Sequence, residues 1–266
     1  MTMTFDDIVY AKQDGIATIT INRPKVLNAF RQQTVMEMVD TFKDAWEDRA
    51  VGVVILTGAG DRAFSTGGDQ SVREAGGYSG RRSRSETGID VEDLHTIIRD
   101  IPKPVIAAVN GYAIGGGHVL HVLCDLTIAA DTARFGQVGP RVGSVDAGFG
   151  TAYLTRLVGE KRAREIWYLC RQYSAQEAFA MGLVNKVVPA AQLPSEAQDW
   201  ARELLAMSPT ALRLAKASFN AASEQIRGVA AVSGQALALY YATEESMEGR
   251  NAFMERRKPD FGRFRK

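Results

Sequence analysis

Residues 104–123 read PVIAAVNGYAIGGGHVLHVL. The run at 105–111 is typical of a strand that is buried on both faces, and an apolar helical run follows the glycines. Glycine costs about 1 kcal/mol in a helix relative to alanine, so the three glycines at 115–117 need a reason. They indicate that exposed backbone has a use where this helix begins.

A second glycine cluster, TGGD at 66–69, follows the apolar run at 51–58. If the two runs are neighbouring parallel strands, both clusters lie at carboxyl ends, where α/β sheets bind ligands. Backbone without side chains lets two N–H groups approach one ligand oxygen, and a helix N-terminus favours negative charge. The pattern predicts an oxyanion hole. Close packing of a helix on a strand is the structural alternative, but it explains a glycine triplet poorly.

The chain alternates between strand and helix patterns before it becomes helical. The patterns predict a hairpin of strands at 5–10 and 15–22, a helix at 34–48, a strand at 51–58, a helix at 91–99, a strand at 105–111, a helix at 118–124 and a strand at 126–130. Helical patterns dominate from about residue 152. We expect an α/β core at 1–195, a helical region at 196–266 and a mobile surface loop at 73–88.

Bulk composition excludes several classes of function. The chain has 266 residues, and 32 basic residues against 31 acidic ones give a net charge of +1, so nothing favours nucleic acid or an anionic membrane. No apolar run approaches the roughly 18 residues of a membrane helix, and a cytoplasmic location is expected. Cys124 and Cys170 lie in apolar runs that suit reduced core residues. The three histidines lack metal-ligand spacing, so no metal site is expected.

One motif suggests a nucleotide but lacks the context for it. TGAGDRA at 57–63 fits the dinucleotide fingerprint G-x-G-x-x-A. A Rossmann turn opens a helix at once, whereas a second glycine pair follows here without helical periodicity. Nucleotide binding is therefore disfavoured.

Three segments together resemble a known superfamily. NRPKVLNAF at 22–30, AFSTGGD at 63–69 and PVIAAVNGYAIGGGHVL at 104–120 resemble the crotonase, or enoyl-CoA hydratase/isomerase, superfamily. The resemblance implies an α/β, ClpP-like spiral of ββα units with a helical C-terminal trimerisation region. It also implies an acyl-CoA substrate and a homotrimer or homohexamer. By this resemblance the backbone N–H groups of Gly68 and Gly116 hold the thioester oxygen.

Two positions depart from the hydratases of this superfamily. Those enzymes place one glutamate two residues after the glycine run and another in the loop after FGQ, where this chain has Val119 and Gly139. Neither residue transfers protons, so glutamate-mediated hydration of a double bond is not expected. Asp146, in GSVDAG, is the nearest remaining carboxylate. A loop aspartate is more often a turn or cap residue.

Further segments resemble two branches of the superfamily: GGDQ at 67–70, FGQVGPRVGSVDAGFGTAYL at 135–154, KRAREIWYLCRQY at 161–173 and RRKPDFG at 256–262. One branch is 2-ketocyclohexanecarboxyl-CoA hydrolase, which opens a ring by adding water to a β-ketoacyl-CoA. The other is 1,4-dihydroxy-2-naphthoyl-CoA synthase of the menaquinone pathway, which closes a ring of o-succinylbenzoyl-CoA by Claisen condensation. Both reactions need a stabilised thioester enolate and a proton donor or acceptor.

The residues divide between these branches. Arg73, Tyr78, Ser144, Asp146 and Tyr241 fall on positions that the synthase uses, whereas Ser71, Val138 and Arg256 depart from its pattern. TGGDQS, GSVD and SPTALRLAKASFN resemble the hydrolase. We favour the hydrolase, with the synthase as the alternative and a non-catalytic CoA-binding homologue as the remoter one.

The resemblance also assigns roles. Gly68 and Gly116 form the oxyanion hole, and Asp146 positioned by Ser144 moves protons. Tyr78 and Tyr241 hydrogen-bond the ring ketone or the carboxylate that it becomes. Contacts with the substrate or its coenzyme A portion are expected from Lys25, Val26, Arg73, Gln137, Gly139, Trp167 and Arg256. No tightly bound cofactor is expected. In the synthase branch with glycine at the Gly139 position, bicarbonate occupies the space and acts as the base, with contacts from the residues matching Gln137 and Trp167.

Overall fold

The computed structural model describes residues 5–78, 83, 85 and 87–265. Its largest sheet has the order β1-β2-β3-β7-β9-β12. The bounds are β1 Ile8–Gln13, β2 Ile16–Ile21, β3 Val53–Gly58, β7 Val105–Val109, β9 Leu126–Ala130 and β12 Lys186–Val188. β1 and β2 form the predicted antiparallel hairpin, and the other neighbouring strands pair in parallel. β3 and β7 are therefore the parallel neighbours that the glycine clusters required.

A second sheet lies beside the first and carries both glycine clusters. Its order is β11-β10-β8-β4, with bounds β4 Ala63–Ser65, β8 Tyr112–Ile114, β10 Arg134–Gly136 and β11 Gln172–Ser174. β3 continues into β4, β7 into β8 and β9 into β10, so each long strand passes to the second sheet through a short one. This repeated step is the expected spiral of ββα units. A separate two-stranded hairpin is formed by β5 Arg73–Glu74 and β6 Gly77–Tyr78.

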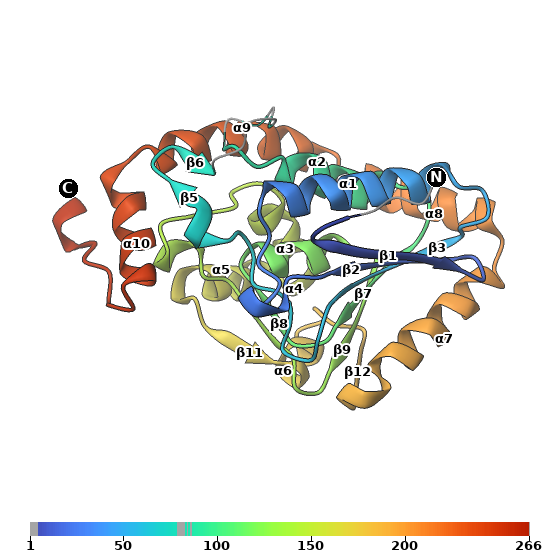
Figure 1. Cartoon of the computed structure of the whole chain (residues 1–266). Coiled ribbons are helices and arrows are strands. Elements are labelled where there is room, and N and C mark those ends of the chain that lie inside the picture. Colours follow the sequence, from blue (N-terminus) through green and yellow to red (C-terminus); the bar gives the residue numbers. More distant parts are fainter. Residues whose placement is uncertain (1–4, 79–82, 84, 86, 266) are drawn as a thin grey trace.

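Helices surround the two sheets (Figure 1). The α-helices are α1 Gln32–Glu47, α2 Val91–Asp100, α3 Gly116–Leu123, α4 Leu154–Val158, α5 Glu160–Leu169, α6 Ala175–Ala180, α7 Leu193–Leu205, α8 Pro209–Ala221, α9 Gln225–Tyr241 and α10 Glu244–Met254. Shorter turns are η1 Pro24–Val26, η2 Gln70–Val72, η3 Gly139–Arg141, the π-helical η4 Phe149–Tyr153, η5 Ala190–Gln192 and η6 Gly262–Phe264. Among the described residues no helix combines the length and apolarity needed to cross a membrane.

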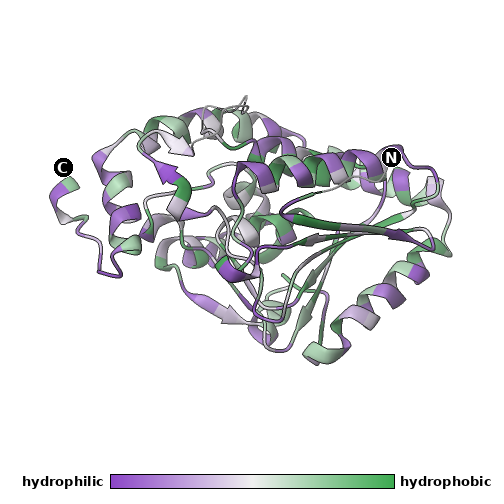
Figure 2. Cartoon of the chain, viewed as in Figure 1, coloured by the Kyte–Doolittle hydropathy of each residue, from purple (hydrophilic) through white to green (hydrophobic). Residues whose placement is uncertain are grey.

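Burial on both faces explains the continuous apolar strands. Alternate residues of β3 point to opposite sides: Val54 and Leu56 join the larger core, while Val53 and Ile55 join a smaller core beneath α7. Figure 2 shows hydrophobic colour along the strands between the helical layers and hydrophilic residues distributed over the outer helices. Cys124 and Cys170 are free and buried, as expected.

The structure moves the boundary between core and C-terminal region. The predicted division between residues 195 and 196 falls inside α7, which packs against β3, β7 and β9 and so belongs to the core. Helix α8, which follows α7, is attached to the core through Lys216. The Lys216 Nζ lies 2.7 Å from Asp125 Oδ2 and donates to the Lys103 carbonyl at 3.0 Å. α9 and α10 then fold back toward β5 and β6 (Figure 1).

The expectation of a mobile loop at 73–88 is wrong for its first part. Residues 73–78 form the β5–β6 hairpin, in which Arg73 and Tyr78 are both buried. The glycines suggested mobility, but they serve a tight turn, where Gly76 has φ +91° and Gly77 has φ +127°. Residues 79–82, 84 and 86 of the predicted loop lie outside the described part of the chain.

The layered core gives a test of stability. Leu56 in β3 is fully buried, so Leu56→Ala is expected to lower the free energy of unfolding by about 2–5 kcal/mol through lost burial and a cavity. Urea denaturation followed by circular dichroism measures the change. Val9→Ala on β1, whose side chain is 51% exposed, is the control and should stay within about 0.5 kcal/mol of the parent. Equal losses in both variants would contradict the layering.

Candidate active site

A cavity of about 920 Å³ lies between the glycine clusters, the loop at 143–150, α2 and α9. It is lined by all the residues that the sequence assigned to the site except Arg73. Lys25 and Val26 reach it from η1, and Arg256 reaches it from beyond the end of α10. These elements are far apart in the chain, and the two sheets with the C-terminal helices bring them together.

The two glycine clusters meet backbone to backbone. β4 and β8 pair in parallel, so TGGD after β4 runs beside the glycines after β8. A Cβ atom at Gly67 would lie 2.6 Å from the Gly116 nitrogen, and one at Gly117 would lie 2.0 Å from the Ser65 carbonyl oxygen. Side chains are excluded at both positions, and Gly67 also has φ +84°. The structure therefore agrees with both explanations of the glycines, which were close packing and exposed backbone.

Two N–H groups remain available where the clusters meet. Gly68 faces Phe30 in an isolated parallel bridge, whose hydrogen bonds use the Gly67 carbonyl and the Asp69 N–H. That pattern turns the N–H of Gly68 away from Phe30. Gly116 is the first residue of α3, where an N–H has no partner within the helix. Among the described residues neither N–H donates a hydrogen bond, and both glycines line the cavity. The backbone thus has the arrangement that the predicted oxyanion hole requires.

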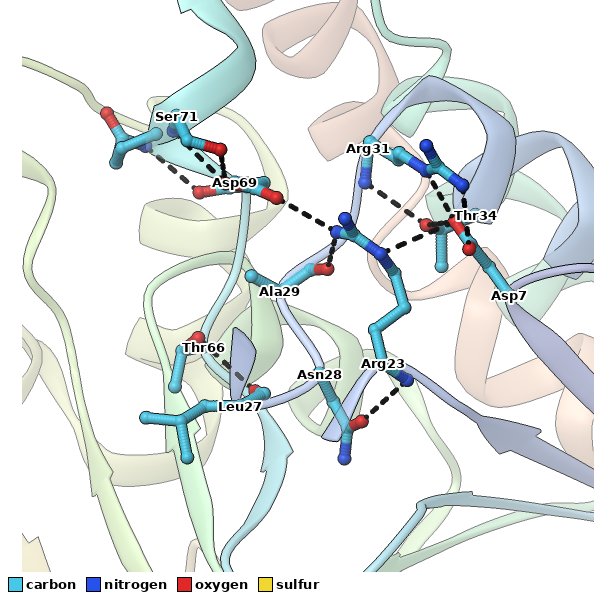
Figure 3. A network of polar contacts seen from close by, with 12 residues as sticks. Asp7, Arg23, Leu27, Asn28, Ala29, Arg31, Thr34, Thr66, Asp69 and Ser71 are labelled. Atoms are coloured by element: carbon cyan, nitrogen blue, oxygen red, sulfur yellow. Dashed lines mark hydrogen bonds and ion pairs between the residues drawn. The ribbon is translucent and has the colours of Figure 1, made fainter. Parts of the chain in front are cut away.

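An ion-pair network holds the Gly68 strand in place (Figure 3). Arg23 Nη1 donates to Asp69 Oδ2 at 3.0 Å and also bonds the Ala29 carbonyl. Asp69 Oδ1 accepts from the Ser71 hydroxyl at 2.6 Å. The segment NRPKVLNAF is therefore fastened to TGGD beside the cavity, which Ala29, Asp69 and Ser71 also line. This contact explains why the two segments occur together in the sequence resemblance.

Tyr78 stands at the oxyanion hole. A Cβ atom at Gly68 would lie 2.0 Å from Tyr78 Oη, so only glycine leaves room for this hydroxyl. Tyr78 Oη accepts from Gln70 Nε2 at 3.2 Å, which leaves its own proton free to donate into the cavity. Burial raises the pKa of Tyr78 well above its ordinary value, so the hydroxyl is protonated at neutral pH.

Tyr241 and Ser144 form a pair, which changes one predicted contact. Ser144 Oγ lies 2.8 Å from Tyr241 Oη, and the Tyr241 ring packs edge-on against Tyr78 with centroids 6.2 Å apart. The sequence interpretation had Ser144 position Asp146. In the structure Asp146 Oδ1 instead accepts from the backbone N–H groups of Gly148 at 3.0 Å and Gly150 at 2.9 Å.

Arg73 does not face the cavity, so its prediction as a substrate contact is wrong. The side chain is fully buried and donates to the carbonyls of Val142, Gly143 and Ser246, each 3.0–3.1 Å away. Its guanidinium carbon lies 4.4 Å from the centre of the Tyr241 ring. Arg73 thus joins the β5–β6 hairpin to the 143–150 loop and α10, and it supports Tyr241 from behind.

Asp146 has two titratable neighbours that the sequence interpretation missed. His95 Nδ1 lies 4.0 Å from Asp146 Oδ2, and Glu92 stands one turn earlier on the same face of α2. Both line the cavity. Burial lowers the pKa of His95, so the imidazole is neutral, and burial raises the pKa of Glu92, with Asp146 and Asp90 contributing. The spacing of three between Glu92 and His95 places them on one face of the helix predicted at 91–99, which was the only signal in the sequence.

The remaining predicted contacts line the same wall. Trp167 Nε1 donates to the Gly150 carbonyl at 2.8 Å, and Gln137 Nε2 lies 3.3 Å from His118 Nδ1. A Cβ atom at Gly139 would lie 2.6 Å from the Ser144 carbonyl oxygen and 3.1 Å from the Trp167 ring. A glutamate at this position would therefore need the loop to move. Val119, the other departure from the hydratase pattern, is buried at the cavity wall.

Comparisons with known proteins agree with this geometry. The model of the enoyl-CoA hydratase/isomerase family matches residues 11–264. The chain belongs to this family. It is accordingly an acyl-CoA enzyme of the crotonase fold.

Solved structures of the family superpose over nearly the whole chain. An enoyl-CoA hydratase from Mycobacterium avium subsp. paratuberculosis is 28% identical, with a TM-score of 0.86 over 97% of this chain and 99% of that one. OdaA from Pseudomonas aeruginosa is 30% identical, with a TM-score of 0.84 over 94% of this chain and 99% of that one. A monofunctional enoyl-CoA isomerase from M. smegmatis is 30% identical, with a TM-score of 0.70 over 81% of this chain and 93% of that one.

The oxyanion hole can be tested without knowledge of the full reaction. Acetoacetyl-CoA ionises to an enolate, and the two N–H groups with Tyr78 should raise the bound enolate fraction. Gly68→Ala drives a methyl group into Tyr78 Oη and should weaken enolate stabilisation about 100-fold. Ultraviolet difference spectroscopy measures the fraction of bound acetoacetyl-CoA that is in the enolate form. Gly228→Ala in α9, where a Cβ meets nothing within 4 Å, is the control. An unchanged enolate signal in the Gly68 variant would contradict the assignment.

Proposed function

We propose that this family member opens the ring of a cyclic β-ketoacyl-CoA of the 2-ketocyclohexanecarboxyl-CoA type by adding water. One observation carries the proposal: the cavity keeps the oxyanion donors of Gly68 and Gly116, holds Val119 and Gly139 where hydratases have glutamates, and places Asp146 at the same cavity instead. The site has the parts for a thioester enolate with a differently placed acid–base group.

The residues divide the reaction between them. Gly68 and Gly116 bind the thioester oxygen, and Tyr78 and Tyr241 orient the ring ketone. Asp146 accepts a proton from water as the water oxygen attacks the ketone carbon. The bond between that carbon and the α-carbon then breaks, and its electron pair becomes the thioester enolate. Asp146 returns the proton to the α-carbon, which is the direct neighbour of the ketone carbon, so one carboxylate serves both atoms.

Asp146 does not by itself separate ring opening from ring closure, because it falls on a position that the synthase also uses. The preference for ring opening rests on the departures from the synthase pattern at Ser71, Val138 and Arg256 and on the segments that resemble the hydrolase.

Mass spectrometry decides between these reactions. The enzyme is incubated with 2-ketocyclohexanecarboxyl-CoA or with o-succinylbenzoyl-CoA, each with and without bicarbonate. Gain of one water by the first compound supports the proposal. Loss of one water by the second establishes the synthase, and no mass change in either overturns both. A rate that depends on bicarbonate would indicate an ion beside Gly139, Gln137 and Trp167, whereas an equal rate without it would leave Asp146 as the base.

Replacement of Asp146 tests its role. Asp146→Asn keeps the size of the side chain and an oxygen for the Gly148 and Gly150 N–H groups, but it cannot accept a proton. We expect ring opening to slow by at least about 100-fold with little change in thermal stability. Asp40→Asn on α1, where the side chain is 56% exposed, is the matched control. A rate near that of the parent enzyme would exclude Asp146 as the base.

We also propose that the chain assembles as a homotrimer or homohexamer. The support is a set of large apolar side chains exposed on α8 and α9: Leu214, Phe219, Val229, Val232 and Leu239. Leu239 is 75% exposed, which is unusual for a surface that stays in water.

The assembly is tested at this surface. Leu239→Glu places a charge that a monomer tolerates but an apolar interface does not. We expect the parent protein to sediment as a trimer or hexamer in analytical ultracentrifugation and the variant to shift toward monomer. Val9→Glu on β1, also exposed, should leave the assembly unchanged. A monomeric parent protein would contradict the proposal.

A further inference from the structure

Helix α2 presents an acid and an imidazole to the cavity that Asp146 also lines. Glu92 and His95 are one turn apart on the cavity side, and His95 Nδ1 is 4.0 Å from Asp146 Oδ2. Glu92 Oε2 accepts from the Ser85 hydroxyl at 3.3 Å, and Glu92 makes no ion pair among the described residues. The role described above for Asp146 leaves this second carboxyl unused.

The surroundings of Glu92 favour its protonated form. The charged and titratable groups that face it are Asp90 and His95 on its own segment, Asp146 from the 143–150 loop and Tyr241 from α9. Gly234 of α9 adds a close backbone wall, because a Cβ there would lie 3.0 Å from Glu92 Oε1. His95 is neutral, and among the described residues no cation makes an ion pair with Glu92. Desolvation and the nearby Asp146 and Asp90 raise the pKa of Glu92, which favours its protonated form.

The hydrogen bonds of the two acids differ. Asp146 accepts two backbone N–H hydrogen bonds. Glu92 is half-buried and has only the longer contact with Ser85, and desolvation together with Asp146 and Asp90 raises its pKa, so its neutral form is favoured. A carboxyl that stays protonated beside a second carboxyl is a candidate general acid.

We propose that Glu92 is a second catalytic residue, the general acid that protonates the carbonyl oxygen attacked by the water that Asp146 deprotonates. The proposal rests on the ring-opening function and deepens it. It distinguishes this site from one in which tyrosine hydroxyls alone polarise the ketone.

The step balances as follows. The water oxygen bonds to the ketone carbon, the water proton passes to Asp146, and the Glu92 proton passes to the ketone oxygen, which gives a neutral gem-diol. Glu92 then takes one hydroxyl proton back as the carbonyl re-forms and the carbon–carbon bond breaks. The electron pair enters the thioester enolate at Gly68 and Gly116, and Asp146 protonates the α-carbon. Both carboxyls return to their starting states, and the products contain one added water.

Glu92→Gln tests this assignment by kinetics. Glutamine retains an N–H donor but transfers no proton, so kcat should fall about 100-fold while KM stays within about twofold. Because the acid must be protonated, the parent rate falls as pH rises through the raised pKa of Glu92, and the variant should lose this basic limb. Glu47→Gln at the exposed end of α1 is the control. A full rate with the basic limb retained would overturn the proposal.

An infrared titration keeps the test independent of the reaction. The parent-minus-Glu92→Gln difference spectrum should contain a carboxylic-acid carbonyl band that persists to a pH above the ordinary glutamate value of 4.5. If the parent enzyme opens no ring, the proposed function fails, and this band still reports the protonated acid. A band that disappears at or below pH 4.5 would overturn Glu92 as the acid, even in an enzyme that opens the ring.

Discussion

The close approach of two backbone segments at the ends of β4 and β8 is the constraint on which the site depends. Gly67 and Gly116 are so near that a Cβ atom at Gly67 would lie 2.6 Å from the Gly116 nitrogen. The pairing of β4 with β8 creates this approach, and the parallel sheet of β3 and β7 brings the two short strands together. Glycine at 115–117 lowers helix propensity. It is required because a side chain at Gly116 or Gly117 would collide with the neighbouring segment.

The same approach decides which groups surround the bound thioester. Gly68 leaves room for Tyr78 Oη, so the donor pair of Gly68 and Gly116 gains a third donor from the β5–β6 hairpin. Behind this hairpin the buried Arg73 lies over the Tyr241 ring. This side chain does not line the cavity, and its hydrogen bonds to Val142, Gly143 and Ser246 hold the hairpin against the 143–150 loop and α10. One buried arginine therefore supports both the hairpin that carries Tyr78 and the ring of Tyr241.

The sequence pattern predicted the fold well because the burial of a strand or helix and the need for glycine depend on residues that are close together in the chain. The strand expected at 126–130 is β9. The glycine clusters lie at neighbouring carboxyl ends, but these are the ends of the short strands β4 and β8 and not of β3 and β7. Contacts between residues that are far apart in the chain could not be predicted from the sequence pattern. Arg73 resembles a ligand residue in sequence, but its partners are carbonyls up to 173 positions away. Ser144 and Asp146 are near neighbours in the chain, yet they take different partners.

Glu92 and His95 illustrate the limit most clearly. Their helix was predicted, but only the fold shows that its cavity face meets the 143–150 loop. The hydratase positions on α3 and η3 hold Val119 and Gly139, while carboxyls stand on α2 and on that loop. The oxyanion hole belongs to the sheet ends and is unaffected by this change. The glycine N–H groups and these carboxyls come from different elements, so substitutions at the α3 and η3 positions leave the backbone of the glycine clusters in place. The proposed relocation of proton transfer therefore requires no change at the ends of β4 and β8, where Gly68 and Gly116 line the cavity.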